Sequence, residues 1–205
     1  VALFKGDFIG QNVRVKEESL FGDEYPALVE KYDGRGLYDE DTGHAFQPYV
    51  IKQVGDAKIA VVGQAFPRTA NANPPEFFPD WSFGLREDDM RDLVKKIRTE
   101  EEVDGCILVS HNGMDVDIKM AERVPGLDAV FGGHTHDGMP RPVEVKNSEG
   151  GKCLVTNAGS NGKYVGVMDF GVEEGKIKSM DYKMLPVFEN LLPADKEMEA
   201  YITQM

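Results

Sequence analysis

Histidines are scarce in this 205-residue chain, and three of the four directly follow or closely follow apolar runs. His134 and His136 lie in the motif GGHTHD, which comes after the apolar residues 127–131. His111 comes after the apolar residues 105–110 in the same way. Neutral imidazole is the commonest protein ligand of transition metals. Three such rings at one place could therefore hold a metal ion.

The position of these histidines after expected strands favours one shared site. Open α/β sheets bind ligands beyond the carboxyl ends of their strands, where both apolar runs end. If the backbone from His134 to His136 is extended, the two side chains project to the same side. The glycines that precede His134 would let the backbone approach closely. Spacing alone is also compatible with a mononuclear zinc site or with ordinary polar loop residues.

Three asparagines near these motifs are candidates for contact with a substrate. Asn112 could bind substrate or support a ligand histidine, and the alternative is that it stabilises a turn. Asn157 and Asn161 belong to a Gly- and Asn-rich loop, residues 157–163 (NAGSNGK). This loop could line a channel to the site, or it could be a plain tight turn.

The remaining polar candidates are expected to act indirectly. Asp137 could orient a ligand histidine from behind. Asp115 and Asp117 are expected to cap the helix that follows them. His44 has no comparable context, and we expect it to be structural or at the surface.

The pattern of apolar residues predicts an α/β fold with a largely buried sheet. Strands are expected at residues 8–15, 46–54, 58–64, 105–110, 127–131, 143–145, 153–156, 164–170 and 177–184. Helices are expected at residues 86–99, 117–124 and 194–205. Hairpin turns are expected at residues 55–57, 150–151 and 174–175. Residues 16–43 are expected to form a long surface loop, and residues 65–83 an irregular but packed segment.

Composition and charge exclude several classes of partner. The hydrophobic fraction of 41% is sufficient for a sizeable core. With 36 acidic and 23 basic residues, the formal net charge is -13, which repels nucleic acid and anionic membranes. An anionic substrate would need a local positive centre. No apolar stretch approaches the roughly 18 residues of a membrane span, and no signal peptide is recognised. Cys106 and Cys153 lie in apolar runs, as two core residues or as a disulfide.

The motifs SHNG (110–113) and GGHTHD (132–137) resemble the last two metal-binding motifs of the calcineurin-like metallophosphoesterases, in the 5'-nucleotidase branch. Within that branch the sequence is most similar to the SoxB thiosulfohydrolases of sulfur oxidation. The matching blocks include DEDTGHAFQPYV, VVGQAFPRTANANP, LVSHNGMDVDIKMA, VTNAGSNGKYVGV and LPVFENLLP. The resemblance runs over nearly all 205 residues.

The resemblance implies a four-layer α/β/β/α sandwich with two divalent metal ions, manganese, between its sheets. His111 and His134 would bind one ion and His136 the other. In nucleotidase relatives the position of His136 is often Gln, so a histidine favours the SoxB thiosulfohydrolases. The family's Asp-x-His, bridging Asp and Gly-Asn ligands are not in this sequence, and we expect them before Val1.

We therefore expect a fragment that is incomplete at the N-terminus and inactive by itself. Residues 1–190 would be the central and C-terminal part of the metallophosphoesterase domain. Residues 191–205 would begin the linker to a further domain.

The activity implied by the resemblance is a sulfohydrolase reaction in the periplasm. The substrate would be a Cys-S-thiosulfonate on the carrier protein SoxYZ, from which sulfate is released. Two metal ions would activate a water molecule and stabilise the charge on the sulfonate oxygens. A periplasmic 5'-nucleotidase-type phosphoesterase and a non-catalytic binding module remain as alternatives.

Overall fold

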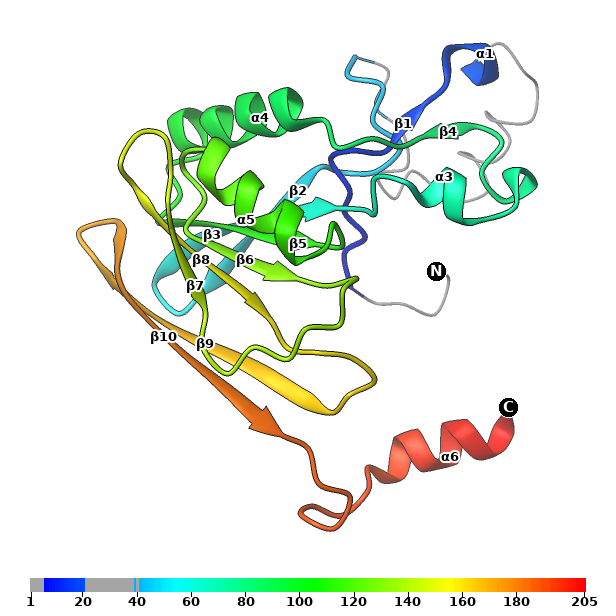
Figure 1. Ribbon diagram of the computed structural model, residues 1–205, viewed down its shortest axis with the longest axis vertical. Coiled ribbons are helices and arrows are strands. Elements are labelled where there is room, and N and C mark those ends of the chain that lie inside the picture. Colours follow the sequence, from blue (N-terminus) through cyan, green and yellow to red (C-terminus); the bar gives the residue numbers. More distant parts are fainter. Residues whose placement is uncertain (1–5, 21–38, 40) are drawn as a thin grey trace.

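The computed structural model describes residues 6–20, 39 and 41–205 (Figure 1). Its centre is a six-stranded sheet of order β2-β3-β5-β6-β8-β7. The strands are β2 Tyr49–Val54, β3 Ala57–Gln64, β5 Gly105–Ser110, β6 Ala129–Gly132, β7 Val143–Lys146 and β8 Lys152–Asn157. β3, β5, β6 and β8 run parallel, and the edge strands β2 and β7 are antiparallel to their neighbours. The expected α/β fold is confirmed.

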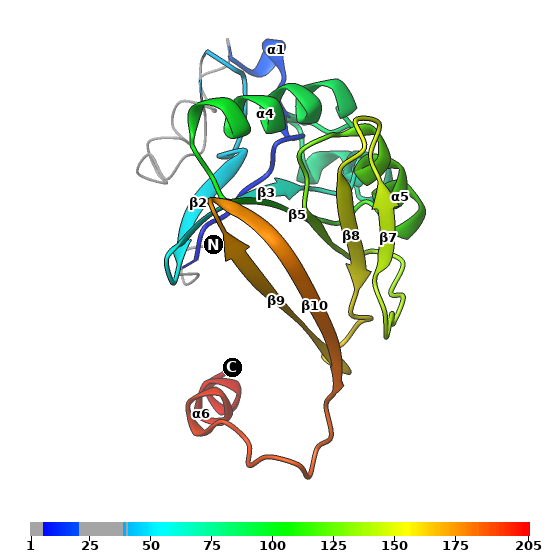
Figure 2. The ribbon, with the colours of Figure 1, turned by 90° about the vertical axis from the view of Figure 1, so that its left-hand side faces the viewer.

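Two amphipathic helices, α4 (Glu87–Glu100) and α5 (Met114–Arg123), cover one face of this sheet (Figures 1 and 2). Alternate residues of the strands point towards these helices, since successive side chains of a strand face opposite sides. Met90 and Ile97 of α4 and Met120 of α5 join Leu108 and Val130 of the sheet in one buried cluster. Burial of the central strands explains why β5 reads as a continuous apolar run.

The opposite face of the sheet is crossed by a long antiparallel hairpin of β9 (Tyr164–Glu173) and β10 (Lys176–Pro186), as Figure 2 shows. A Cβ atom added to Gly105 in β5 would lie only 2.6 Å from Cδ1 of Ile177, so the hairpin lies directly on the sheet there. The described residues thus form the layers α/β/β of the expected α/β/β/α sandwich. These layers agree with the expected fold class.

The N-terminal segment differs from expectation. A strand over residues 8–15 was expected, but only β1 (Arg14–Val15) forms, and it pairs with β4 (Trp81–Ser82). The reason is a turn at Asn12, whose buried amide donates to the carbonyl oxygens of Ala65 and Gly84, both at 2.8 Å. These side-chain hydrogen bonds take the place of the backbone hydrogen bonds between strands that a longer strand would form.

Other elements agree with the sequence more closely, apart from their ends. The expected helix at residues 117–124 begins three residues earlier, because Gly113 ends the preceding turn with a φ of 103°. The remaining short elements are α1 Glu17–Leu20, α3 Thr69–Ala72, η1 Pro75–Phe77 and α6 Lys196–Gln204. Most of the expected long loop at 16–43 lies outside the described residues.

Cys106 and Cys153 are both free and fully buried, so the alternative of a disulfide is wrong. They lie on β5 and β8, with β6 between them. Two strand spacings are about 9–10 Å, which is beyond the reach of a disulfide. Burial raises the pKa of the Cys106 thiol to about 12. Both residues are therefore unreactive core side chains.

Among the described helices, none has the length and apolar character needed to cross a membrane.

Candidate active site

The structure brings the loops that follow β5 and β6 together. The rings of His111 and His134 have centroids 5.2 Å apart and an interplanar angle of 70°. A Cβ atom on Gly133 would lie 3.1 Å from Nδ1 of His111 and 3.3 Å from the carbonyl oxygen of Ser110. These distances are shorter than most Cβ contacts, so a side chain at this position would push the two loops apart by a few tenths of an ångström. Two of the three predicted ligands, His111 and His134, therefore lie next to each other, and Gly133 packs against His111.

The backbone that carries His134 and His136 is not extended, so that expectation is wrong. His134 has a φ of 73°, and the N–H of Thr135 donates to the carbonyl of Gly133 at 2.9 Å, which closes a γ-turn. His136 has a φ of 59°. A γ-turn with positive φ is rare and strained, and such conformations persist only where surrounding structure holds them. They cluster at functional sites, and here they lie at two predicted ligands.

Phe66 is a part of the site that sequence reasoning missed. Its ring stacks on His134 with centroids 4.0 Å apart and an interplanar angle of 23°, and it meets the ring of His111 edge-on at 6.4 Å. Phe66 lies two residues beyond the carboxyl end of β3. The rule that located the histidines, a position just after a parallel strand, could have located it as well.

The charge state of His111 suits a role as a ligand. The pKa of His111 is lowered from its usual value by partial burial and then by the neighbouring His134 and His136. A depressed pKa keeps the ring neutral at physiological pH, with one nitrogen free to donate its lone pair.

A buried network of polar side chains lies beneath these histidines. Asn112 is 4% exposed; its Oδ1 accepts from Nε2 of Gln64 at 3.1 Å, and its Nδ2 donates to Oδ1 of Asp117 at 3.1 Å. This placement favours the structural alternatives for Asn112 over contact with a substrate. The expectation that Asp115 and Asp117 cap the helix is wrong, because Gly113 occupies the N-cap and no side chain caps it.

The other predicted residues lie at the end of β8 and in the loops that follow β6 and β8. Asn157 is 1% exposed and accepts from the N–H of Gly159 at 3.1 Å, as expected for a turn residue. Asn161 is exposed, with a φ of 58°. Asp137 is also exposed, and its carboxylate accepts from the hydroxyl of Thr135. In the described hydrogen bonds it contacts no histidine ring.

His44 is 8% exposed, and its Nδ1 lies 2.7 Å from Oγ1 of Thr42. Burial, and then the charge of Arg14, lower the pKa of His44 to about 4. A buried, neutral histidine agrees with the structural role expected for it.

The donor set is of the right kind for a divalent transition metal, because imidazoles suit such ions. Within the part of the chain that the structure describes, however, no group of three or more His, Cys, Asp or Glu side chains is placed to hold an ion. These residues therefore fit as part of a metal centre and not as the whole of one.

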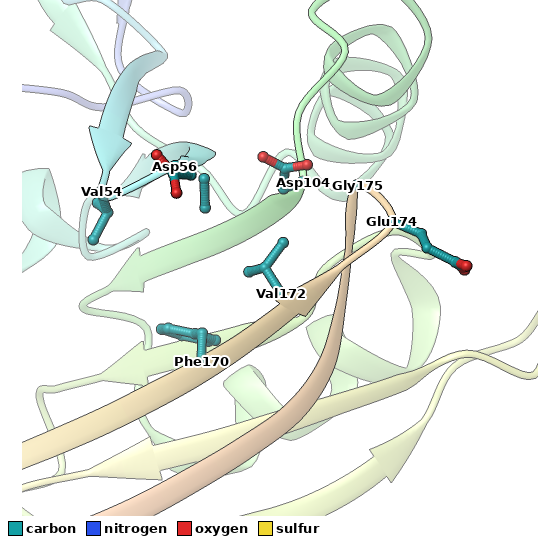
Figure 3. Close-up of a pocket in the computed structure, with 8 residues that line it drawn as sticks. Val54, Asp56, Asp104, Phe170, Val172, Glu174 and Gly175 are labelled. Carbon is teal, nitrogen blue, oxygen red and sulfur yellow. The ribbon is translucent and has the colours of Figure 1, made fainter.

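A cavity of about 360 Å³ lies at the opposite edge of the sheet, between the β2–β3 turn and the β9–β10 hairpin (Figure 3). The residues that line it include Asp56, Asp104, Phe170, Val172 and Glu174, and the carboxylate of Glu174 points away from Val172 (Figure 3). β3 and β5 are parallel and both begin there, so this is the amino edge of the sheet. The cavity is thus separate from the histidine loops.

Comparison with known proteins identifies the class. UshA of Escherichia coli is 28% identical over 74% of this chain, and the trifunctional nucleotide phosphoesterase YfkN of Bacillus subtilis is 30% identical over 74%. The match covers 32% of UshA and 10% of YfkN, so the chain spans a third or less of these relatives. No model of a protein family matches the chain. A 5'-nucleotidase precursor from Thermus thermophilus shares the fold, with a TM-score of 0.71 at 22% identity, over 96% of this chain and 36% of its own. With its fold and motifs, the chain falls in the 5'-nucleotidase branch of the calcineurin-like metallophosphoesterases.

Within that branch the chain is SoxB-like. The solved structure of the sulfate thiohydrolase SoxB from Thermus thermophilus superposes with a TM-score of 0.79 at 32% identity. The match covers 99% of this chain and 32% of SoxB.

Proposed function

We propose that this chain is the histidine-bearing part of a metal-dependent hydrolase, and that the whole protein releases sulfate from a Cys-S-thiosulfonate on the carrier SoxYZ. The observation that carries this proposal is the 32% identity with SoxB along 99% of the chain. A histidine at position 136, where the resemblance implies that nucleotidases often have Gln, gives further support.

In this proposal His111 and His134 hold one divalent cation and His136 holds a second, with manganese as the metal. Such a pair of cations lowers the pKa of a bound water and stabilises negative charge on substrate oxygens. The remaining ligands would come from parts of the whole protein outside this sequence. The neutral state of His111 and the opposed rings of His111 and His134 support this assignment.

The reaction would break the bond between the terminal sulfonate sulfur and its neighbouring sulfur. Water supplies the oxygen that converts the sulfonate into sulfate, and the carrier keeps a persulfide with the electron pair of the broken bond. One proton goes to the persulfide and the other to solvent. No oxidant or reductant is needed, because this is a hydrolysis.

The chain's own residues would position the reacting groups. Phe66 covers one face of the His134 ring, which keeps water from that side and fixes the ring plane. Asn161, exposed in the loop after β8, is the residue of the three predicted asparagines that could contact the carrier arm. A net charge of -13 would otherwise repel the anionic sulfonate, so local cations are required.

We place the whole protein in the periplasm, where it would meet the carrier. The support is the similarity to SoxB and to a 5'-nucleotidase described as a precursor. We expect neither nucleic acid nor membranes among its partners.

A 5'-nucleotidase-type phosphoesterase is the second candidate. It is favoured by the 28% identity with UshA and by a 27% identity with the 5'-nucleotidase of Vibrio cholerae. Phosphate monoesters and thiosulfonates both present an anionic group to the metals, so the metal site by itself does not separate the two.

Parallel assays of the whole protein separate these functions. We expect Mn2+-dependent release of sulfate from thiosulfonated SoxYZ, loss of that activity with a chelator, and little phosphate release from AMP. Efficient AMP hydrolysis with no sulfate release would assign the nucleotidase function instead. If neither substrate is hydrolysed and Mn2+ does not bind, the protein is a non-catalytic binding module.

A further inference from the structure

Asp117, in the first turn of α5, is a buried carboxyl group that lies under both histidine loops. Its side chain is 0% exposed. Its Oδ1 accepts from the hydroxyl of Ser110 at 2.6 Å and from Nδ2 of Asn112 at 3.1 Å. These two residues flank His111 in the sequence. One carboxylate oxygen of Asp117 therefore binds the residue before His111 and the residue after it.

The second carboxylate oxygen faces the other loop. Oδ2 of Asp117 would lie 2.6 Å from a Cβ atom on Gly132, so the carboxyl packs directly against the backbone of that glycine. Gly132 ends β6, and the strained turn at His134 begins one residue later. This oxygen is buried and has no hydrogen-bond partner. Asp117 thus meets the second loop by contact, in a space that only glycine leaves open.

The network around Asp117 extends to a third strand end. The hydroxyl of Ser110 also accepts from the N–H of Asn112 at 3.1 Å, and Oδ1 of Asn112 accepts from Gln64 at the end of β3. The ends of β3 and β5 and helix α5 are therefore joined by one set of hydrogen bonds, and β6 by contact. His111 lies at the centre of this arrangement.

Two ordinary explanations for a buried aspartate do not apply to Asp117. It is not a helix cap, because Gly113 fills that position. It takes part in none of the ion pairs among the described residues, and Lys, Arg and His do not contribute to its pKa. Burial raises the pKa of Asp117 to about 6. Burying an unpaired carboxyl destabilises a fold, so its favourable contribution is confined to the contacts described above.

We propose that Asp117 is a positioning residue that fixes the loop of His111 against the loop of His134 and His136. This inference rests on the proposed function only in that the histidines bind metal. Asp117 does not touch substrate or metal in this arrangement. It acts through Ser110, Asn112 and Gly132.

The test uses the whole protein and four variants. Asp117→Leu removes both hydrogen bonds and keeps a side chain of similar size. Asp117→Asn keeps an oxygen that can accept from Ser110 and Asn112. Ser110→Ala removes one bond from the other side. Asp115→Ala is the matched control, since Asp115 lies in the same helical turn, is exposed and has no partner among the described hydrogen bonds and ion pairs.

Amide hydrogen exchange of the metal-free protein is the first measurement. In Asp117→Leu we expect exchange to rise about tenfold or more in residues 110–114 and 132–137 together, as loss of a charge-assisted bond predicts. Exchange in residues 105–109 of β5 and in β8 should not change. A purely structural role would instead raise exchange throughout the core. Asp117→Asn should restore exchange to within about threefold of the parent, because an amide oxygen still accepts both bonds.

Titration with Mn2+ is the second measurement. We expect Asp117→Leu to weaken Mn2+ binding by roughly 10–100-fold, the usual effect of losing a residue that orients ligands. Ser110→Ala should cause a smaller loss, and Asp115→Ala none. If Asp117→Leu does not fold, Ser110→Ala is compared with Asp117→Asn. Exchange in the two loops should rise in Ser110→Ala and stay near that of the parent in Asp117→Asn.

The two proposals fail in different ways. If the parent protein binds no Mn2+ while Asp117→Leu loosens both loops, the metal proposal fails and the positioning role stands. If Asp117→Leu folds and both loops exchange as in the parent, the positioning role is wrong, whatever the metal does. A rise confined to residues 110–114 would also overturn it, because the second loop would then be independent of Asp117.

Discussion

The amino edge and the carboxyl edge of the six-stranded sheet, where its parallel strands begin and end, carry different chemical groups. At the amino edge a cavity of about 360 Å³ is lined by residues that include Asp56 and Asp104. At the carboxyl edge His111 and His134 face one another over a buried polar network, on a backbone with positive φ at His134 and His136. No imidazole is among the residues that line this cavity.

This contrast teaches that converging donors and strained backbone mark the candidate site, whereas a cavity alone does not identify one. Strain at the carboxyl edge is held by the contacts of Gly133 and by the stack of Phe66 on His134. At the amino edge Asp104 accepts from the N–H of Lys58 at 2.6 Å, which is an ordinary local bond. Variants at the two edges should therefore behave differently.

The largest expected difference comes from His134→Ala compared with Asp56→Asn. Loss of an imidazole ligand should reduce Mn2+ affinity and Mn2+-dependent hydrolysis by at least about 100-fold, beyond the usual effect of changing a residue behind a ligand. His134 is exposed, so the free energy of unfolding should fall by no more than the roughly 0.5–1.5 kcal/mol of its stack with Phe66. Titration calorimetry and the sulfate-release assay provide the measurements.

Asp56→Asn is the control at the amino edge, and it should leave both quantities unchanged. If Asp56→Asn weakens Mn2+ binding as much as His134→Ala does, the assignment of the metal site to the carboxyl edge is wrong.

The next effect concerns the contact between the two histidine loops. Gly133→Ala should lower the free energy of unfolding by about 1–3 kcal/mol, because the new methyl group would lie 3.1 Å from Nδ1 of His111. Gly84→Ala is the matched control, since its methyl group would meet only the flexible side chain of Arg86, at 3.7 Å. Urea unfolding of both variants tests this. Equal free energies of unfolding for the two variants would mean that the loops of His111 and His134 can move apart without loss of stability.

A smaller effect is expected for the aromatic stack. Phe66→Leu should cost about 0.5–1.5 kcal/mol of stacking energy, which corresponds to a loss of up to tenfold in Mn2+ affinity if the stack orients His134. Phe77→Leu is the control, because Phe77 is 63% exposed in η1 and contacts only Phe78 among the described aromatic pairs. Equal Mn2+ affinities for the two variants would show that the stack does not position the ring.

Much of the carboxyl edge follows from the sequence. Continuous apolar runs specified β5 and β6, and the rule for open sheets placed His111 and His134 at neighbouring strand ends. The close approach at Gly133 was also expected from residue type, because a glycine before a histidine motif allows it. These features depend on local pattern and topology, which a single sequence contains.

The parts that the sequence did not reveal depend on contacts between distant residues. The turn at His134 replaced an expected extended backbone, and Asn12 removed most of an expected strand through bonds to residues far along the chain. Asp117 looked like a helix cap, since Asp is a common cap, yet its partners are Ser110 and Asn112. Which donor meets which acceptor is decided by tertiary structure, and spacing carries little information about it.

His44 extends the comparison to a histidine at neither site, where burial and not ligation sets the chemistry. The pKa of His44 is lowered to about 4 in the folded protein, below its usual value of 6.5. Protonation therefore favours the unfolded chain. The contribution of the neutral His44 to the free energy of unfolding is fully present above pH 6.5. It is lost progressively as the pH falls towards 4 and changes no further below pH 4. Between pH 7 and pH 5.5 the loss due to this residue should be about 1 kcal/mol.

Urea unfolding of the parent and of His44→Gln over this pH range measures that loss. The difference between the two stability curves should slope between pH 7 and pH 4, because glutamine does not titrate. Parallel curves would mean that the pKa of His44 is the same in the folded and unfolded states. Burial would then not determine its charge, and the contrast between exposed ligand histidines and a buried neutral one would no longer apply.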